Sequence, residues 1–140
     1  MKYQVTGNEY VSLPTIREID GGLEGISFLH MGSKGMLELC GSTELPLLRP
    51  YIELNGVRQP LIEFHWSLDQ FWIPSFTAIS GDLKIKGTWL CPLGERGFGC
   101  KLEVKNESGA KVDISFGLDG CWAQTLHSIN ESKPIEGTMH

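Results

Sequence analysis

The stretch that decides the fold is KVDISFGL, residues 111–118, in which apolar and polar side chains alternate one by one. Successive side chains of an extended chain point to opposite faces. A period of two therefore predicts a β-strand with one buried face and one wet face. The expected buried side carries Val112, Ile114, Phe116 and Leu118.

The segments before this stretch repeat the pattern. In GCKLEVK, residues 99–105, apolar side chains alternate with charged ones, and the linking NESGA, residues 106–110, is short and contains a glycine. These two segments are predicted to pair as a β-hairpin. Residues 82–91 alternate as well, which extends the prediction to a three-stranded meander ending near Trp122. The side chains expected to be buried together are Leu83, Ile85, Trp89, Leu102, Val104, Val112, Ile114 and Phe116.

Two further hairpins are predicted. Asn55-Gly56 is the strongest short turn signal of the chain, and β-branched or aromatic residues flank it on both sides. Residues 25–30 and 35–40 have the composition of two strands around the turn at 31–34.

The segment that follows, from residue 61 onward, is aromatic. Its alternation puts Ile62, Phe64 and Trp66 on one face of a strand. Pro74, in the next apolar segment, predicts an edge strand or a bulge, because proline cannot donate a backbone hydrogen bond.

No long window shows a sustained helical period, and 17 glycines and 7 prolines are spread along the chain. Many short strands joined by turns predict an all-β domain, an antiparallel β-sandwich of two packed sheets. We expect this domain to span residues 1–128. Residues 129–140 lose the apolar pattern and are expected to form a tail or the start of an interdomain linker.

The composition excludes several classes of partner. The formal net charge is −5, and the 12 Lys and Arg residues are scattered, so we expect no nucleic-acid binding. The start of the chain lacks the apolar core of a secretory signal, and no apolar stretch approaches the roughly 20 residues that span a bilayer. We therefore expect a soluble, cytoplasmic protein with no membrane partner.

The sequence offers no metal or cofactor motif. The four cysteines form no C-x-x-C pair, and the four histidines lack the H-x-H or H-x-x-x-H spacing of metal ligands. We expect reduced, half-buried thiols. Cys91 and Cys100 fall on neighbouring predicted strands, and whether they are bridged stays open.

Catalytic motifs are also missing. There is no G-x-S-x-G and no G-x-x-x-x-G-K, and the glycine-rich residues 94–99 open a strand, which predicts a hairpin turn. Glu63 and His65 stand two residues apart on a predicted strand. They have the chemistry of an acid/base or metal pair, but an exposed polar face is the favoured interpretation. We expect no catalytic residue and no enzyme activity from this chain alone.

The aromatic run 63–72 mixes rings with hydrogen-bonding side chains, which is the make-up of a sugar-binding surface. The candidate residues for contact with a carbohydrate or a neighbouring domain are Trp66, Trp72, Phe71, His65 and Asp69. Packing of these rings in the core or an interface is the competing and favoured explanation. Trp89 is expected in the core. An exposed patch of Phe71, Trp72, Ile73 and Trp66 would also allow a homo-oligomer to form.

Three short motifs carry a family resemblance that covers about a third of the chain. They are ERGF at residues 95–98, L-x-V-x-N at 102–106 and G-L-x-G-C-W at 117–122. In these motifs the chain resembles the non-catalytic N-terminal β-sandwich of bacterial glycoside hydrolases of the glycogen-debranching, amylo-α-1,6-glucosidase type.

The resemblance implies a carbohydrate-active parent enzyme in which this sandwich precedes an (α/α)6 catalytic barrel. Catalytic carboxylates would lie on that barrel, so none is assigned to this chain. The implied function is a non-catalytic accessory domain that braces the catalytic domain of a longer chain. The alternative is a free-standing carbohydrate-binding module, which would rest on the tryptophans and the polar residues beside them.

Overall fold

The computed structural model describes residues 2–30 and 35–129, and every regular element in them is an antiparallel β-strand. The predicted all-β, sandwich-like class is therefore confirmed. The first six strands are β1 (Tyr3–Gly7), β2 (Val11–Arg17), β3 (Gly25–His30), β4 (Gly35–Cys40), β5 (Leu48–Leu54) and β6 (Val57–Gln59). The other six are β7 (Ile62–Asp69), β8 (Ile73–Ser80), β9 (Leu83–Leu90), β10 (Gly99–Asn106), β11 (Ile114–Gly120) and β12 (Gln124–Ile129).

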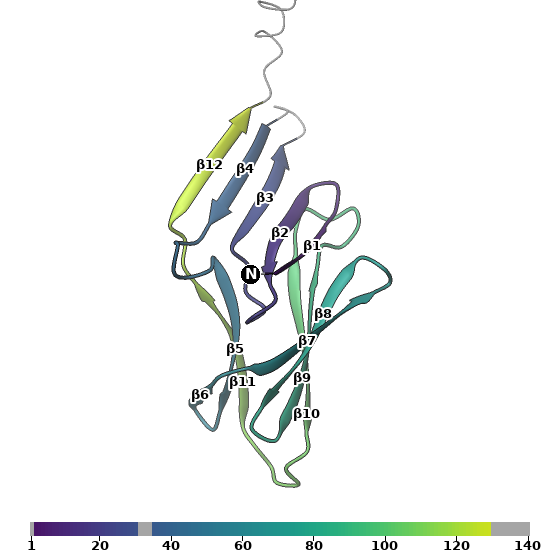
Figure 1. The fold of residues 1–140 in the computed structure, drawn as a ribbon, viewed down its shortest axis with the longest axis vertical. Helices are drawn as coiled ribbons and strands as arrows, with labels where there is room; N and C mark the ends of the chain where they lie inside the picture. Colours follow the sequence, from purple (N-terminus) through teal and green to yellow (C-terminus); the bar gives the residue numbers. More distant parts are fainter. Residues whose placement is uncertain (1, 31–34, 130–140) are drawn as a thin grey trace, which may run out of the picture.

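The strands form three ladders (Figure 1). A five-stranded sheet has the order β1-β2-β3-β4-β12, and a three-stranded sheet has the order β11-β5-β6. Single bridges from Leu23 to Ile16 and to Leu48 join these two sheets into one layer. The second layer is a four-stranded sheet of order β10-β9-β8-β7, in which every strand pairs with its sequence neighbour.

The core lies between the layers in two clusters. The larger joins Leu13, Ile16 and Leu23 of the first layer to Trp89 of the second, and Trp89 is 0% exposed. The smaller joins Ile52 of β5 to Leu83 and Ile85 of β9. Burial of such apolar surface, at roughly 25 cal/mol per Å², is the main stabilising term of the fold.

The Asn55-Gly56 hairpin forms as predicted. Both residues have a positive φ, 50° and 79°, as the tight turn between β5 and β6 requires. The turn pairs Leu54 with Val57 and Glu53 with Arg58. The β3–β4 pair is also as predicted, although the turn at 31–34 lies outside the described residues.

The predicted hairpin between residues 99–105 and 111–118 is wrong, and so is the meander that ends near Trp122. β10 pairs with β9, whereas β11 pairs with β5 in the other layer. The chain crosses between layers after Asn106. Alternation identifies the buried face of each strand, but it cannot say which strand lies beside it.

Two assignments of side chains to faces also change. Phe116 is 50% exposed instead of buried, because β11 is an edge strand, while Val112 and Ile114 do pack on the smaller core cluster. In β7 an irregularity between Ile62 and His65, with Glu63 at φ 57°, inserts one extra residue. Phe64 and Trp66 therefore contact Phe76, while Ile62 is half exposed.

Pro74 is the third difference, because β8 lies between β7 and β9 and is not an edge strand. Proline is tolerated there because the β8–β9 ladder starts at Ser75, one residue later. The strand β12 ends at Ile129, and residues 130–140 of the expected tail lie outside the described residues. No helix in the part of the chain that the structure describes is long and apolar enough to cross a membrane.

Candidate functional site

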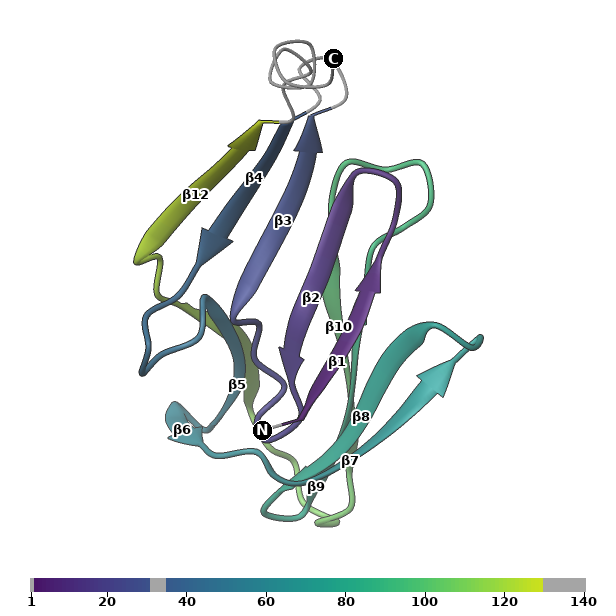
Figure 2. The same ribbon diagram turned by 45° about the horizontal axis from the view of Figure 1, so that its top comes forward.

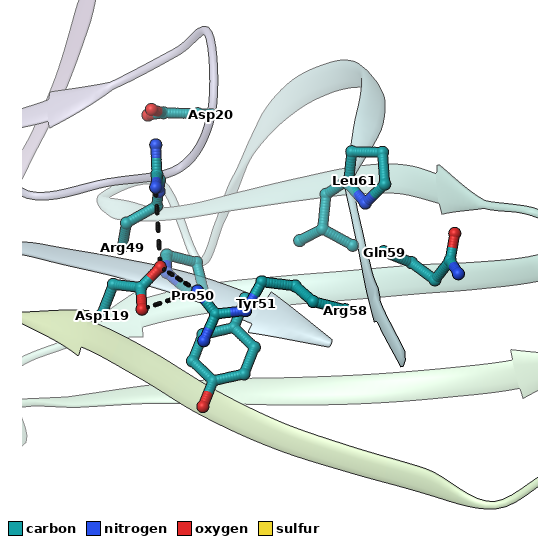
Figure 3. Close-up of a pocket in the computed structure, with 9 residues that line it drawn as sticks. Asp20, Arg49, Pro50, Tyr51, Arg58, Gln59, Leu61 and Asp119 are labelled. Atoms are coloured by element: carbon teal, nitrogen blue, oxygen red, sulfur yellow. Dashed lines mark hydrogen bonds and ion pairs between the residues drawn. The ribbon is translucent and has the colours of Figure 1, made fainter. Parts of the chain in front are cut away.

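A cleft of about 420 Å³ opens where β6 ends and the chain leaves the three-stranded sheet (Figure 3). Its polar wall carries Asp20, Arg49, Tyr51, Arg58, Gln59 and Asp119. The apolar residues that line the cleft are Pro50, Pro60 and Leu61. The volume is within the usual range of small-molecule pockets, about 300–1,000 Å³.

Asp119 on β11 is the centre of the polar wall. Nη1 of Arg58 lies 2.8 Å from both carboxylate oxygens of Asp119, and Nη2 of Arg49 lies 3.5 Å from one of them. Arg49 is the cross-strand partner of Asp119. The hydrogen bond with Asp119 raises the pKa of Arg58. These groups are partly exposed, so the network contributes orientation more than stability.

The ring of Tyr51 helps to orient Arg58. Tyr51 pairs with Gly117 across β5 and β11, and its ring lies so close over Gly117 that no Cβ would fit there. The guanidinium of Arg58, on β6, lies over that ring, 3.7 Å from its centroid. A cation over an aromatic face is attracted by the ring's quadrupole, so Tyr51 helps to hold Arg58 toward Asp119.

The polar wall also includes the connection from β2 to β3, where Asp20 lies beside Arg49 (Figure 3). Its carboxylate lies 2.6 Å from Nη2 of Arg17 and accepts the backbone N–H of Gly22. Two tryptophans that pack in the core donate hydrogen bonds to the backbone of this connection. Nε1 of Trp66 donates to the Glu18 carbonyl at 2.8 Å, and Nε1 of Trp89 donates to the Gly21 carbonyl at 2.7 Å.

The residues that the sequence singled out are not gathered in one place. Trp66 lies on the inner face of β7, partly buried against the core, and supports the wall of the cleft. His65 and Asp69 belong to the opposite face of β7, where Asp69 forms an ion pair with Lys86 at 3.2 Å. Trp66 and Trp72 therefore do not form one flat platform with His65 and Asp69.

Phe71 and Trp72 lie at the tip of the β7–β8 hairpin, which projects from the molecule in Figure 2. Phe71 is 94% exposed and has φ 74°. A bulky residue in the left-handed region is unusual, since that region favours glycine and asparagine. The expectation that these two rings contact a sugar, a domain or a second copy stays a prediction.

A second surface lies on the first layer, beyond the edge of the four-stranded sheet. In Figures 1 and 2, β4 and β12 stand clear of that sheet. Phe116 and Leu118 share the inner face of β11 with Ile114, which packs on the core, and they and Trp122, in the link to β12, are exposed by 50%, 47% and 70%. The indole N–H of Trp122 donates to Oγ1 of Thr125, which pairs with Leu39 on the same inner face. We call these three residues the docking face.

Sequence reasoning missed the cleft because its charged residues come from β5, β6, β11 and the β2–β3 connection. One signal was available. The Asn55-Gly56 turn fixes the pairing of β5 with β6, and this register brings Arg58 beside Tyr51. The position of Asp119 could not be obtained this way, because the sequence does not show that β11 pairs with β5.

The four cysteines, Cys40, Cys91, Cys100 and Cys121, are free thiols, which answers the question left open for Cys91 and Cys100. Within residues 2–30 and 35–129, no three side chains of His, Cys, Asp or Glu gather closely enough to hold a metal ion. Comparison of the chain with family models, with curated proteins and with solved structures found no match.

Proposed function

We propose that this chain is a non-catalytic accessory domain of a carbohydrate-active enzyme and that it braces an (α/α)6 catalytic domain through the docking face. The observation that carries the proposal is the exposure of Leu118 and Trp122. Both belong to the G-L-x-G-C-W motif at residues 117–122, one of the three motifs on which the family resemblance rests.

Core packing does not account for Leu118 and Trp122 of this motif. A buried leucine or tryptophan would be explained by the stability of the sandwich alone, whereas exposed apolar side chains lower solubility and add little stability. Apolar side chains left uncovered on the inner face of a sheet are typical of a surface that another domain covers. Free thiols fit a reducing compartment, so in this proposal the parent enzyme acts in the cytoplasm.

The test compares residues 1–140 with the complete product of the natural gene by hydrogen–deuterium exchange. We expect the complete product to carry a helical catalytic domain and to hydrolyse α-glucosidic bonds. Amides of β11 and residues 121–123 should exchange more slowly in it than in residues 1–140. The double variant Leu118→Ser, Trp122→Ser should remove that difference, and Leu93→Ser, which changes an exposed leucine elsewhere, should keep it.

Two results would overturn the proposal. One is a gene product without a second domain, and the other is equal exchange of these amides in the two proteins. The second candidate function is a free-standing carbohydrate-binding module. It is favoured by the cleft around Asp119 and does not depend on the docking face.

A further inference from the structure

We propose that the cleft between Asp20 and Asp119 binds a neutral saccharide, with Arg58, Gln59 and Asp119 contacting its hydroxyl groups. The inference rests on the geometry of the cleft and not on the docking face. Saccharide binding and domain docking can therefore fail separately.

The polar wall has the donors and acceptors that a sugar requires. Adjacent hydroxyls of a pyranose present two oxygens side by side, each able to donate and to accept. Planar carboxylate, amide and guanidinium groups match such a pair with two parallel hydrogen bonds. Arg58 uses Nη1 for Asp119, and a guanidinium has five N–H donors, so donors remain for a ligand.

The charge balance favours a neutral ligand over an anion. Arg49 and Arg58 line the cleft together with Asp119 and Asp20, and Asp20 is itself paired with Arg17. Both arginines already face the Asp119 carboxylate. A phosphate or a carboxylate placed between them would lie against that negative charge, whereas a hydroxyl can donate to Asp119 and accept from Arg58.

The opposite wall supplies apolar contact. Leu61 lies across the cleft from Arg49 and Asp119 in Figure 3, and Pro60 precedes it in the lining, whereas Pro50 lies among the charged groups. A pyranose ring has patches of C–H groups beside its hydroxyl rim, so it can satisfy a polar wall and an apolar wall together. A purely polar ion would leave the apolar wall without a partner.

The polar groups are held in place before a ligand arrives. Arg58 is fixed between the Tyr51 ring and Asp119, and Asp20 is fixed by Arg17 and the N–H of Gly22. Side chains that are already ordered lose less conformational entropy on binding. This preorganisation distinguishes the cleft from an ordinary surface ion pair.

The experiment is an NMR titration of the ¹⁵N-labelled protein, residues 1–140, with each of three neutral probes, maltotriose, cellotriose and xylotriose. Digalacturonic acid and inorganic phosphate are the anionic probes. We expect at least one neutral probe to shift the amides of Arg49, Arg58, Gln59 and Asp119, and phosphate to leave them unchanged.

Matched variants test which residues bind. Arg58→Lys keeps the positive charge but loses the planar guanidinium with its several N–H donors. This change should weaken saccharide binding at least about 10-fold. Arg96→Lys is its control, because Arg96 also lies over a tyrosine, Tyr10, but away from the cleft. Gln59→Ala should weaken binding, and Gln124→Ala, on β12, should not. Far-UV circular dichroism of each variant verifies the fold.

Three results would overturn the inference. The first is that no neutral probe shifts the cleft amides. The second is that only digalacturonic acid or phosphate does, which would make the cleft an anion site. The third is that Arg58→Lys and Arg96→Lys bind the saccharide equally well.

Discussion

The ring of Tyr51 lies directly against the backbone of Gly117, its cross-strand partner, at a separation that leaves no room for a Cβ. Phe76 covers Gly87 in the same way in the other layer. In both pairs an aromatic side chain fills the space that a glycine leaves on the neighbouring strand. The Tyr51 ring in turn contacts the guanidinium of Arg58, 3.7 Å from the ring centroid.

Gly117→Ala should push the Tyr51 ring away and loosen Arg58. Gly117 needs space but no positive φ, so the expected cost is that of overpacking, about 1–3 kcal/mol of unfolding free energy. Urea denaturation measures it. Gly99→Ala is the control, since nothing lies within 4 Å of a Cβ there. Equal stability of the two variants would contradict the close packing of the Tyr51 ring on Gly117.

Trp89→Phe should destabilise the protein by about 2–4 kcal/mol, because it leaves a cavity and an unpaired Gly21 carbonyl in the core. Trp122→Phe makes the same chemical change at a side chain that is 70% exposed, and should stay within about 0.5 kcal/mol. Thermal unfolding followed by near-UV circular dichroism compares them. If the two losses are similar, the core has been placed wrongly.

Phe71→Asn should raise the unfolding free energy by about 1 kcal/mol, because asparagine tolerates the left-handed conformation and the exposed ring contributes no burial. Leu93→Asn, at an exposed leucine without a positive φ, should change little. Chemical denaturation of both variants gives the difference. A loss of stability in Phe71→Asn would show that the ring contacts something within the domain.

Burial raises the thiol pKa of Cys91 to about 11 and that of Cys100 to about 12, from the ordinary value of 9.0. The folded state therefore holds these protons more tightly than the unfolded chain. The resulting stabilisation is complete below pH 9.0 and is lost as the pH rises through about 11 and 12.

Alkylation by iodoacetamide, followed by peptide mass spectrometry, measures this protection. Cys91 and Cys100 should stay unlabelled in the folded protein near neutral pH and react fully in urea, because only the thiolate is nucleophilic. Labelling of the buried Cys91 at the rate of Cys121, which like Cys100 is partly exposed, would contradict the burial argument.

The sequence predicts each strand better than it predicts the partner of that strand. Alternation located β9, β10 and β11, and Asn55-Gly56 located a hairpin with its register. The partner of β11 was missed because an apolar face looks the same whether it covers a neighbour or the opposite layer. The extra residue at Glu63 was also missed, because a bulge within a strand does not change the alternation of apolar and polar residues in the sequence.

The candidate site was harder to predict for the same reason. Trp66 and Trp72 drew attention because aromatic rings carry a chemical signal of their own. The cleft instead depends on Arg58 of β6 meeting Asp119 of β11, a contact across 61 residues of sequence. Neither residue is unusual alone, and only the pairing of β5 with both strands brings them together.

The crossing of the chain between layers after β10 has a consequence for the order of folding. Strands β7 to β10 pair only with sequence neighbours, so their sheet closes short loops. The other layer must join β4 to β12 and β5 to β11, and closing those long loops costs more entropy before any contact forms. We expect pulsed hydrogen-exchange labelling during refolding to protect β8 and β9 before β11 and β12. Simultaneous protection would contradict this order. The docking face and the cleft both include β11, so each becomes complete only in the last, slowest step of folding.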